Sequence, residues 1–247
     1  MGVSKPYTYI LEESKNMIDT YTMVLWAKAN DDGIDIQAKQ VFNILTILNQ
    51  VPYLRPKYLT ARKKKDIKEF ELTFDNVRKM IIKKGDKQFV ELGSKISFFT
   101  SLNEEESVGI TISIGVSKIK FQNSIVLDLN SDYKEQNVER FDELSKTFKK
   151  LVSVFNPFYG CITSRSNSNM FDTYYDKTNN LLSSVFDINY WGEDIVNNLP
   201  IREIQKKVFE CVEINRGYYI RLQKEPVDIL NRSHMKLQKD INCLIGI

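Results

Sequence analysis

The alternation of apolar and polar residues predicts several β-strands in this chain. Residues 109–115 (GITISIG) place isoleucine at every second position, with threonine and serine between. A period of two gives a strand one apolar and one polar face, which suits an antiparallel sheet covered on one side. Further strands are predicted at 21–29, 95–100, 123–129 and 158–164. The sheet is therefore predicted to be mainly antiparallel.

Apolar residues that recur every three or four positions predict amphipathic helices between the strands. The first helix is expected to begin at Asp35, a good N-cap residue, and to end before Pro52. A second begins near Thr73 and stops at Gly85, where glycine suits a helix end. Three more are predicted over 137–155, 187–199 and 228–245.

A hairpin is predicted near the C-terminal end of the sequence. Residues 208–214 and 218–222 alternate on either side of Asn215-Arg216-Gly217, a short glycine-bearing turn. Strands followed by helices in both halves indicate an α+β fold, in which a mainly antiparallel sheet packs with amphipathic helices. One domain over residues 1–247 is the simplest arrangement, and two pseudo-repeated halves remain an alternative.

The composition indicates a folded protein that needs no disulfide or metal for its stability. The chain has 247 residues, of which 42% are hydrophobic, so it can bury a sizeable core. Its three cysteines are an odd number at wide spacing, which favours buried, reduced thiols in a cytoplasm over a disulfide framework. No stretch approaches the roughly 18 apolar residues of a membrane span, so a soluble cytoplasmic protein is expected.

Charges of opposite sign are concentrated in different segments, although the net charge is only +3. Residues 55–68 are basic and residues 172–198 are acidic. Aromatic residues ringed by carboxylates suit a surface that binds a basic partner, so the acidic stretch is the candidate partner-binding surface. The alternative is an ordinary solvated loop. The candidate binding residues are Asp172, Tyr174, Tyr175, Asp176, Asp187, Glu193 and Asp194.

The sequence shows no recognisable catalytic or metal-binding constellation. His234 is the single histidine, so a histidine triad or a histidine-rich zinc site cannot be assembled, and a structural hydrogen bond is expected for it. Neither phosphate-binding glycine motif occurs. Cys161 and Cys211 fall within predicted strands and are expected to be buried rather than nucleophilic. We therefore expect no enzyme activity, no cofactor and no metal.

Two alternative functions depend on local charge. An enzyme of unrecognised type would use the carboxylates at 104–106 or in the acidic stretch, but adjacent carboxylates usually decorate solvated turns or helix N-termini. A nucleic-acid-binding module would use the basic segment 55–68, which is disfavoured by the near-neutral total charge and the lack of interleaved aromatics beyond Tyr58.

Two blocks of sequence resemble a known family. The order Glu91-Leu92-Gly93, the strand 109–115 and then 123–129 (NSIVLDL) is similar to the central region of the family 52 immunity proteins of bacterial polymorphic toxin systems. The tail from Tyr190-Trp191-Gly192 through residues 217–222 to Gly246 is similar to that family's C-terminal pattern. The resemblance implies a cytoplasmic antidote that binds and neutralises a cognate toxin protein, often a nuclease, and it carries no catalytic residues.

Overall fold

The computed structural model describes residues 20–61, 63–85, 88–129, 138–171, 175–176 and 181–247. Most of its strands belong to one sheet. The strands of that sheet are β1 (Tyr21–Ala27), β2 (Tyr58–Leu59), β3 (Lys68–Glu69), β4 (Ser94–Phe99), β5 (Val108–Ile114), β6 (Asn123–Leu129), β7 (Tyr159–Ser164), β10 (Ile188–Trp191), β11 (Glu210–Ile214) and β12 (Gly217–Arg221). A separate pair consists of β8 (Tyr175–Asp176) and β9 (Leu181–Leu182).

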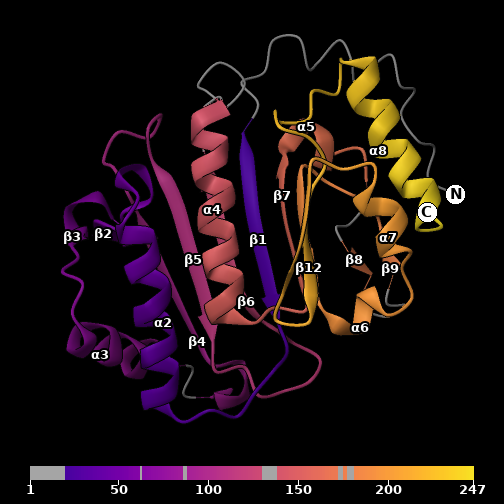
Figure 1. The fold of residues 1–247 in the computed structure, drawn as a ribbon. Coiled ribbons are helices and arrows are strands. Elements are labelled where there is room, and N and C mark those ends of the chain that lie inside the picture. Colours follow the sequence, from indigo (N-terminus) through magenta and orange to yellow (C-terminus); the bar gives the residue numbers. More distant parts are fainter. Residues whose placement is uncertain (1–19, 62, 86–87, 130–137, 172–174, 177–180) are drawn as a thin grey trace, which may run out of the picture.

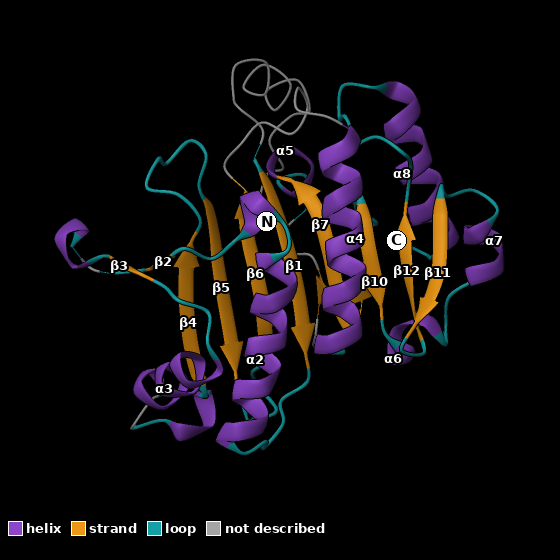
Figure 2. Cartoon of the chain, turned by 60° about the vertical axis from the view of Figure 1, so that its left-hand side comes forward, coloured by secondary structure: helices purple, strands orange, loops and turns teal. Residues whose placement is uncertain are grey.

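The ten strands of the main sheet lie in the order β11-β12-β10-β7-β1-β6-β5-β4-β2-β3 (Figure 2). Every neighbouring pair in this order is antiparallel. The predicted α+β class and the mainly antiparallel sheet are thus confirmed. Strand β1, the first of the described strands, lies in the middle of the sheet between β6 and β7.

Helices of very different length accompany the sheet. They are α2 (Ile34–Asn49), α3 (Phe74–Lys84), α4 (Val138–Phe155), α5 (Arg165–Ser168), α6 (Glu193–Val196), α7 (Ile201–Gln205) and α8 (Arg232–Leu244), with 3-10 turns at Pro52–Leu54, Lys64–Asp66 and Val90–Leu92. The predicted limits of α3 hold, because the Thr73 side chain accepts a hydrogen bond from the Asn76 N–H and Gly85 follows the last turn. Helix α2 begins at Ile34 with Gly33 as its N-cap, so Asp35 is not the N-cap that the sequence predicts. The Asp35 carboxylate pairs with Arg78 of α3 at 2.6 Å.

Two apolar cores lie on opposite faces of the sheet. One core packs α2, α3 and α4 against the inward-facing residues of β1 and β4–β6, such as Ile112 and Leu127. The other packs α6, α7 and α8 against β7, β10 and β12, and it includes Tyr159 and Trp191. Figure 1 shows α2 and α4 over one face, with α7 and α8 grouped beside the C-terminal half of the sheet.

The prediction of a helix over residues 187–199 is wrong. Its first part forms strand β10, which pairs with β7 and β12, and only the short helix α6 follows after Gly192. All four residues of β10 are buried, so this strand has no polar face and no alternation that would distinguish it from a buried helix. Tyr190 and Trp191 are completely buried, and they lie on a strand within the sheet rather than on the predicted helix.

The predicted hairpin is confirmed as β11 and β12, paired from Glu210↔Arg221 to Ile214↔Gly217. Asn215 and Arg216, at its turn, have φ values of 50° and 62°. Two successive residues with positive φ match the right-handed twist of the strands that they join. The last predicted helix begins later than expected, at Arg232, where the Asn231 side chain accepts hydrogen bonds from the Ser233 and His234 N–H groups.

Candidate functional site

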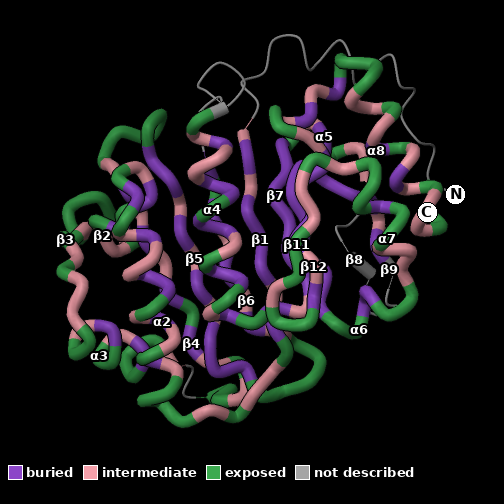
Figure 3. Tube along the Cα trace, viewed as in Figure 1, coloured by how far each residue is buried: buried purple, intermediate pink, exposed green. Residues whose placement is uncertain are grey.

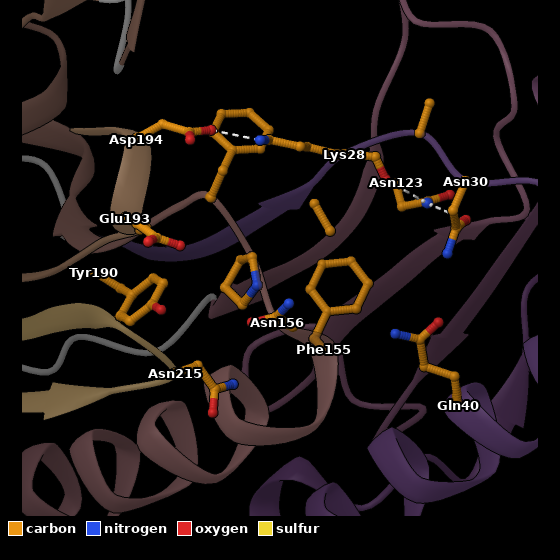
Figure 4. Close-up of a pocket in the computed structure, with 15 residues that line it drawn as sticks. Lys28, Asn30, Gln40, Asn123, Phe155, Asn156, Tyr190, Glu193, Asp194 and Asn215 are labelled. Atoms are coloured by element: carbon orange, nitrogen blue, oxygen red, sulfur yellow. Dashed lines mark hydrogen bonds and ion pairs between the residues drawn. The ribbon is translucent and has the colours of Figure 1, made fainter. Parts of the chain in front are cut away.

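A polar cavity of about 350 Å³ opens at one end of the sheet (Figure 4). It lies where the chain leaves β1 and β10, where α4 ends before β7, and where the β11–β12 hairpin turns. We call it the sheet-end cavity. The labelled side chains that line it are Lys28, Asn30, Gln40, Asn123, Phe155, Asn156, Tyr190, Glu193, Asp194 and Asn215.

Asparagine side chains hold the loops around the sheet-end cavity in place. Asn123 accepts a hydrogen bond from the Val116 N–H at 2.9 Å and donates to the carbonyl of Lys28 at 3.0 Å. Asn215 donates to the carbonyls of Val152 and Ser153 at 3.2 and 3.3 Å, so the hairpin turn is fastened to the last turn of α4. The cavity wall is therefore held by hydrogen bonds between distant segments.

The hairpin is also packed closely against the wall of the cavity. The Tyr190 hydroxyl donates a hydrogen bond to the carbonyl of Ile214 at 2.9 Å. Burial raises the pKa of Tyr190 to about 12, so the phenol stays protonated at neutral pH and remains a donor. A Cβ atom at Gly217 would lie 2.4 Å from the Trp191 carbonyl oxygen, so only glycine allows this approach without a shift of the backbone.

Two carboxylates stand at the rim of the sheet-end cavity, and both belong to the predicted binding set. Asp194 pairs with Lys28 at 2.5 Å, and Glu193 lies 3.8 Å from Arg216. All four side chains are more than half exposed, with fractions between 54% and 81%. Exposed pairs contribute little stability, about 0–1 kcal/mol each. A partner with its own cations could therefore replace Lys28 and Arg216 at small cost.

The other predicted binding residues lie in different parts of the molecule or outside the described residues. Asp187 is only 1% exposed, and its Oδ1 accepts a hydrogen bond from the Val227 N–H at 2.6 Å. Its assignment to an exposed binding surface is therefore wrong, because the carboxylate lies in the interior. Tyr175 and Asp176 form strand β8, whereas Asp172 and Tyr174 lie outside the described residues.

Several residues of the cavity have no counterpart in the sequence-based prediction. Lys28, Gln40, Asn123 and Asn215 come from four distant segments, and only the order of the strands brings them together. Asn123 does begin the NSIVLDL block, and Asn215 does lie in the hairpin turn. Both positions were therefore visible as structural signals, but neither indicated a shared cavity.

The single histidine and the cysteines occupy structural or surface positions. His234 accepts a hydrogen bond from the Asp228 N–H at its Nδ1 atom, at 3.1 Å, which confirms a structural bond. Cys161 is buried, and burial raises its pKa to about 12. Cys211 is half-buried. Cys243 is exposed, contrary to the expectation that the thiols are buried.

The basic segment 55–68 lies far from the sheet-end cavity. It runs through β2 and β3 at one edge of the sheet, whereas the cavity is lined from the inner strands β1, β6 and β10, and Lys64 in the segment pairs with Glu104 at 3.5 Å. Strand β10, in the described part of the acidic segment, is thus several strands away from β2 and β3. In the described part of the chain, no cluster of three or more histidine, cysteine, aspartate or glutamate side chains is suited to a metal ion.

Comparison with known proteins identifies a structural neighbour. No protein-family model and no curated protein matches the chain. Among solved structures, the T6SS protein PA0821 of Pseudomonas aeruginosa superposes with a TM-score of 0.60 at 11% sequence identity. The match covers 96% of this chain and 83% of that protein. At this identity the likeness shows a shared fold.

Among the described residues, no helix has the length and apolarity needed to cross a bilayer.

Proposed function

We propose that this chain is a non-enzymatic immunity protein that binds and neutralises a cognate bacterial toxin in the cytoplasm, with a nuclease-type toxin domain as the expected partner. The observation that carries the proposal is the rim of the sheet-end cavity, where Glu193 and Asp194 are held on a fixed framework in weak, exposed ion pairs. The fold shared with a T6SS protein is compatible with a toxin-related role. Membership of immunity family 52 is part of the proposal.

The charge of the cavity lining fits a basic partner. Among the cavity's described lining residues, Glu193 and Asp194 accompany one cation, Lys28, and the Arg216 that pairs with Glu193 is outside the lining. A nuclease cleft that binds phosphates is positively charged, so it complements such a rim. The remaining lining consists largely of amides and aromatic rings, which can pair with backbone groups and fill space at an interface core.

The test is co-expression with the product of the neighbouring open reading frame, because immunity genes normally follow toxin genes. The wild-type chain should restore growth and copurify with that product. The variant Glu193→Lys/Asp194→Lys should bind at least about tenfold more slowly at low salt, and its association rate should depend less on ionic strength. The measurement is the association rate at two salt concentrations.

A charge-matched control separates steering by this rim from general electrostatics. The variant Glu105→Lys/Glu106→Lys changes the charge equally at an exposed turn beside β4 and β5. It should bind like the wild type. If the control loses association and the rim variant keeps it, the docking surface lies at the 104–106 turn instead. If the wild-type chain neither binds nor protects, the proposed function fails.

A further inference from the structure

A second cavity lies between helix α8 and residues 170–171, which follow α5. We call it the α8 cavity. Its volume is about 500 Å³, which is within the range of small-molecule sites. Met170, Phe171 and Met235 supply apolar surface, and Phe171 packs edge-on against Phe186 of the core at 5.7 Å between ring centroids. The cavity therefore offers space for an apolar body.

The rim of the α8 cavity is positively charged. Arg232, Lys236 and Lys239 follow one another along α8, and all three line the cavity. Lys236 pairs with Asp240 at 2.6 Å. The pKa of Asp240 is lowered first by this hydrogen bond and further by the charges of Lys236, Lys207 and Lys239. One carboxylate thus faces several lysines, which leaves an excess of positive charge.

A buried acceptor also lines the α8 cavity. Gln238 is 1% exposed, and its Nε2 donates to the carbonyl of Val185 at 2.7 Å and to Asn167 Oδ1 at 3.1 Å. Among the described residues, its Oε1 atom has no hydrogen-bond partner. Because buried polar atoms are normally paired, this oxygen suits a ligand that carries an N–H or O–H group.

We propose that the α8 cavity binds a small amphipathic anion: an aliphatic or aromatic body, a hydrogen-bond donor that reaches Gln238, and a carboxylate or sulfonate beside Arg232 and Lys239. The apolar surface, the cationic rim and the buried acceptor each account for one part of this ligand. This site is independent of the proposed toxin-binding surface, because it lies on a different set of elements.

The dye 1-anilinonaphthalene-8-sulfonate tests the proposal, because it combines aromatic rings, an N–H group and a sulfonate. Titration of the 247-residue chain should give one saturable site with enhanced fluorescence. The variant Arg232→Glu/Lys239→Glu should weaken binding by about tenfold or more, since each exposed charge contributes a few-fold. The matched control Lys79→Glu/Lys120→Glu, at exposed lysines elsewhere, should bind like the wild type. Melting temperatures confirm that both variants are folded.

Cys243 provides an independent readout, because it lines the same cavity and its side chain is exposed. A maleimide should modify Cys243 first, since Cys161 is buried and burial also raises the pKa of Cys211. Saturating dye should slow this modification several-fold. 10-Hydroxydecanoate should displace the dye at roughly tenfold lower concentration than 1,10-decanediol, which has the same chain length and a hydroxyl donor but no charge. Unchanged labelling, equal competition, or unchanged affinity in Arg232→Glu/Lys239→Glu would overturn the proposal.

Discussion

The two halves of the sheet are buried in different ways. In β5 and β6, buried residues alternate with partly exposed ones, whereas every residue of β7 and β10 is buried. Figure 3 draws β7 in the colour of buried residues. The cores explain the difference. Helix α4 packs on one face of β7 and β10, and α6, α7 and α8 pack on the other. No described helix covers the second face of β4–β6, so that face keeps its hydroxyls and charges.

This contrast implies that the same kind of substitution costs more stability in one half of the sheet than in the other. In the half that is covered on both faces, any change of volume meets a packed neighbour, and any lost polar partner leaves a buried group unpaired. In the half that is covered on one face, alternate positions adjoin solvent and can relax. Matched substitutions in the two halves should therefore differ in cost.

The largest difference is expected between the two tryptophans. Trp191 on β10 is completely buried, so Trp191→Ala should lower the free energy of unfolding by about 3–5 kcal/mol. Trp26 on β1 is half-buried, with its ring 5.4 Å from that of Tyr159, so Trp26→Ala should cost about 1 kcal/mol. Urea unfolding followed by circular dichroism measures both. A Trp191→Ala protein with unchanged stability but no partner binding would instead place Trp191 in the interface.

The next difference concerns two glycines on strands. A Cβ atom at Gly160 of β7 would lie 2.4 Å from Leu25 Cδ2, whereas one at Gly109 of β5 would meet nothing closer than 3.7 Å. Gly160→Ala should therefore destabilise by about 1–3 kcal/mol. Gly109→Ala should be neutral or stabilise by up to about 1 kcal/mol, because alanine restricts the unfolded chain. Equal shifts of the urea midpoint in the two variants would contradict the comparison.

A similar expectation separates a buried carboxylate from an exposed one. Asp187→Ala removes the acceptor of the Val227 N–H and should cost about 1–3 kcal/mol. Asp187→Asn keeps an acceptor oxygen and should recover part of that loss. Asp194→Ala breaks only an exposed pair with Lys28 and should change stability by less than about 1 kcal/mol. Thermal unfolding of the three variants gives the order, and an Asp194→Ala cost above that of Asp187→Ala would contradict it.

The smallest effect is expected at Asp128, on the uncovered face of β6. Partial burial raises its pKa above the ordinary 3.8, although a hydrogen bond with Thr22 opposes the shift. A raised folded-state pKa means that the contribution to stability is complete below pH 3.8 and is lost as the pH rises through the folded value. Asp128→Asn should match the wild type in the acid range and exceed it at neutral pH by a few tenths of a kcal/mol. An NMR titration of the Asp128 carboxyl checks the direction of the shift.

The same contrast explains which elements could be predicted from the sequence. Strands covered on one face, such as residues 109–115, show an alternation that specifies both structure and orientation. Helix α3 could be predicted because Thr73 and Gly85 are local end signals. Strand β10 could not, because INYW is buried on both sides and has no period of its own. Its burial depends on α4, which precedes it in the chain, and on α6, α7 and α8, which follow it.

The candidate site could be predicted only in part, for a related reason. Glu193 and Asp194 were predicted because acidic residues are conspicuous in a local window of sequence. Their neighbours Lys28 and Asn215 are far away in the chain, and only the order of the strands determines that they meet. Asp187 was wrongly assigned to an exposed surface because its carboxylate accepts a hydrogen bond from the N–H of Val227, which is distant in the sequence. The residues next to Asp187 in the sequence do not distinguish such a buried carboxylate from a solvated one.

The central place of β1 has a consequence for how the chain acquires its shape during synthesis. Its partners are Asn123–Leu129 and Tyr159–Ser164, so β1 leaves the ribosome long before either exists. At about 5–20 residues per second, translation of the intervening chain takes several seconds or more. Strands β4, β5 and β6 can pair with one another as they emerge from the ribosome. The backbone N–H and C=O groups of β1 stay without strand partners until β6 and β7 have been synthesised. The middle of the finished sheet is thus assembled late, and nascent β1 is the segment that a chaperone would shield.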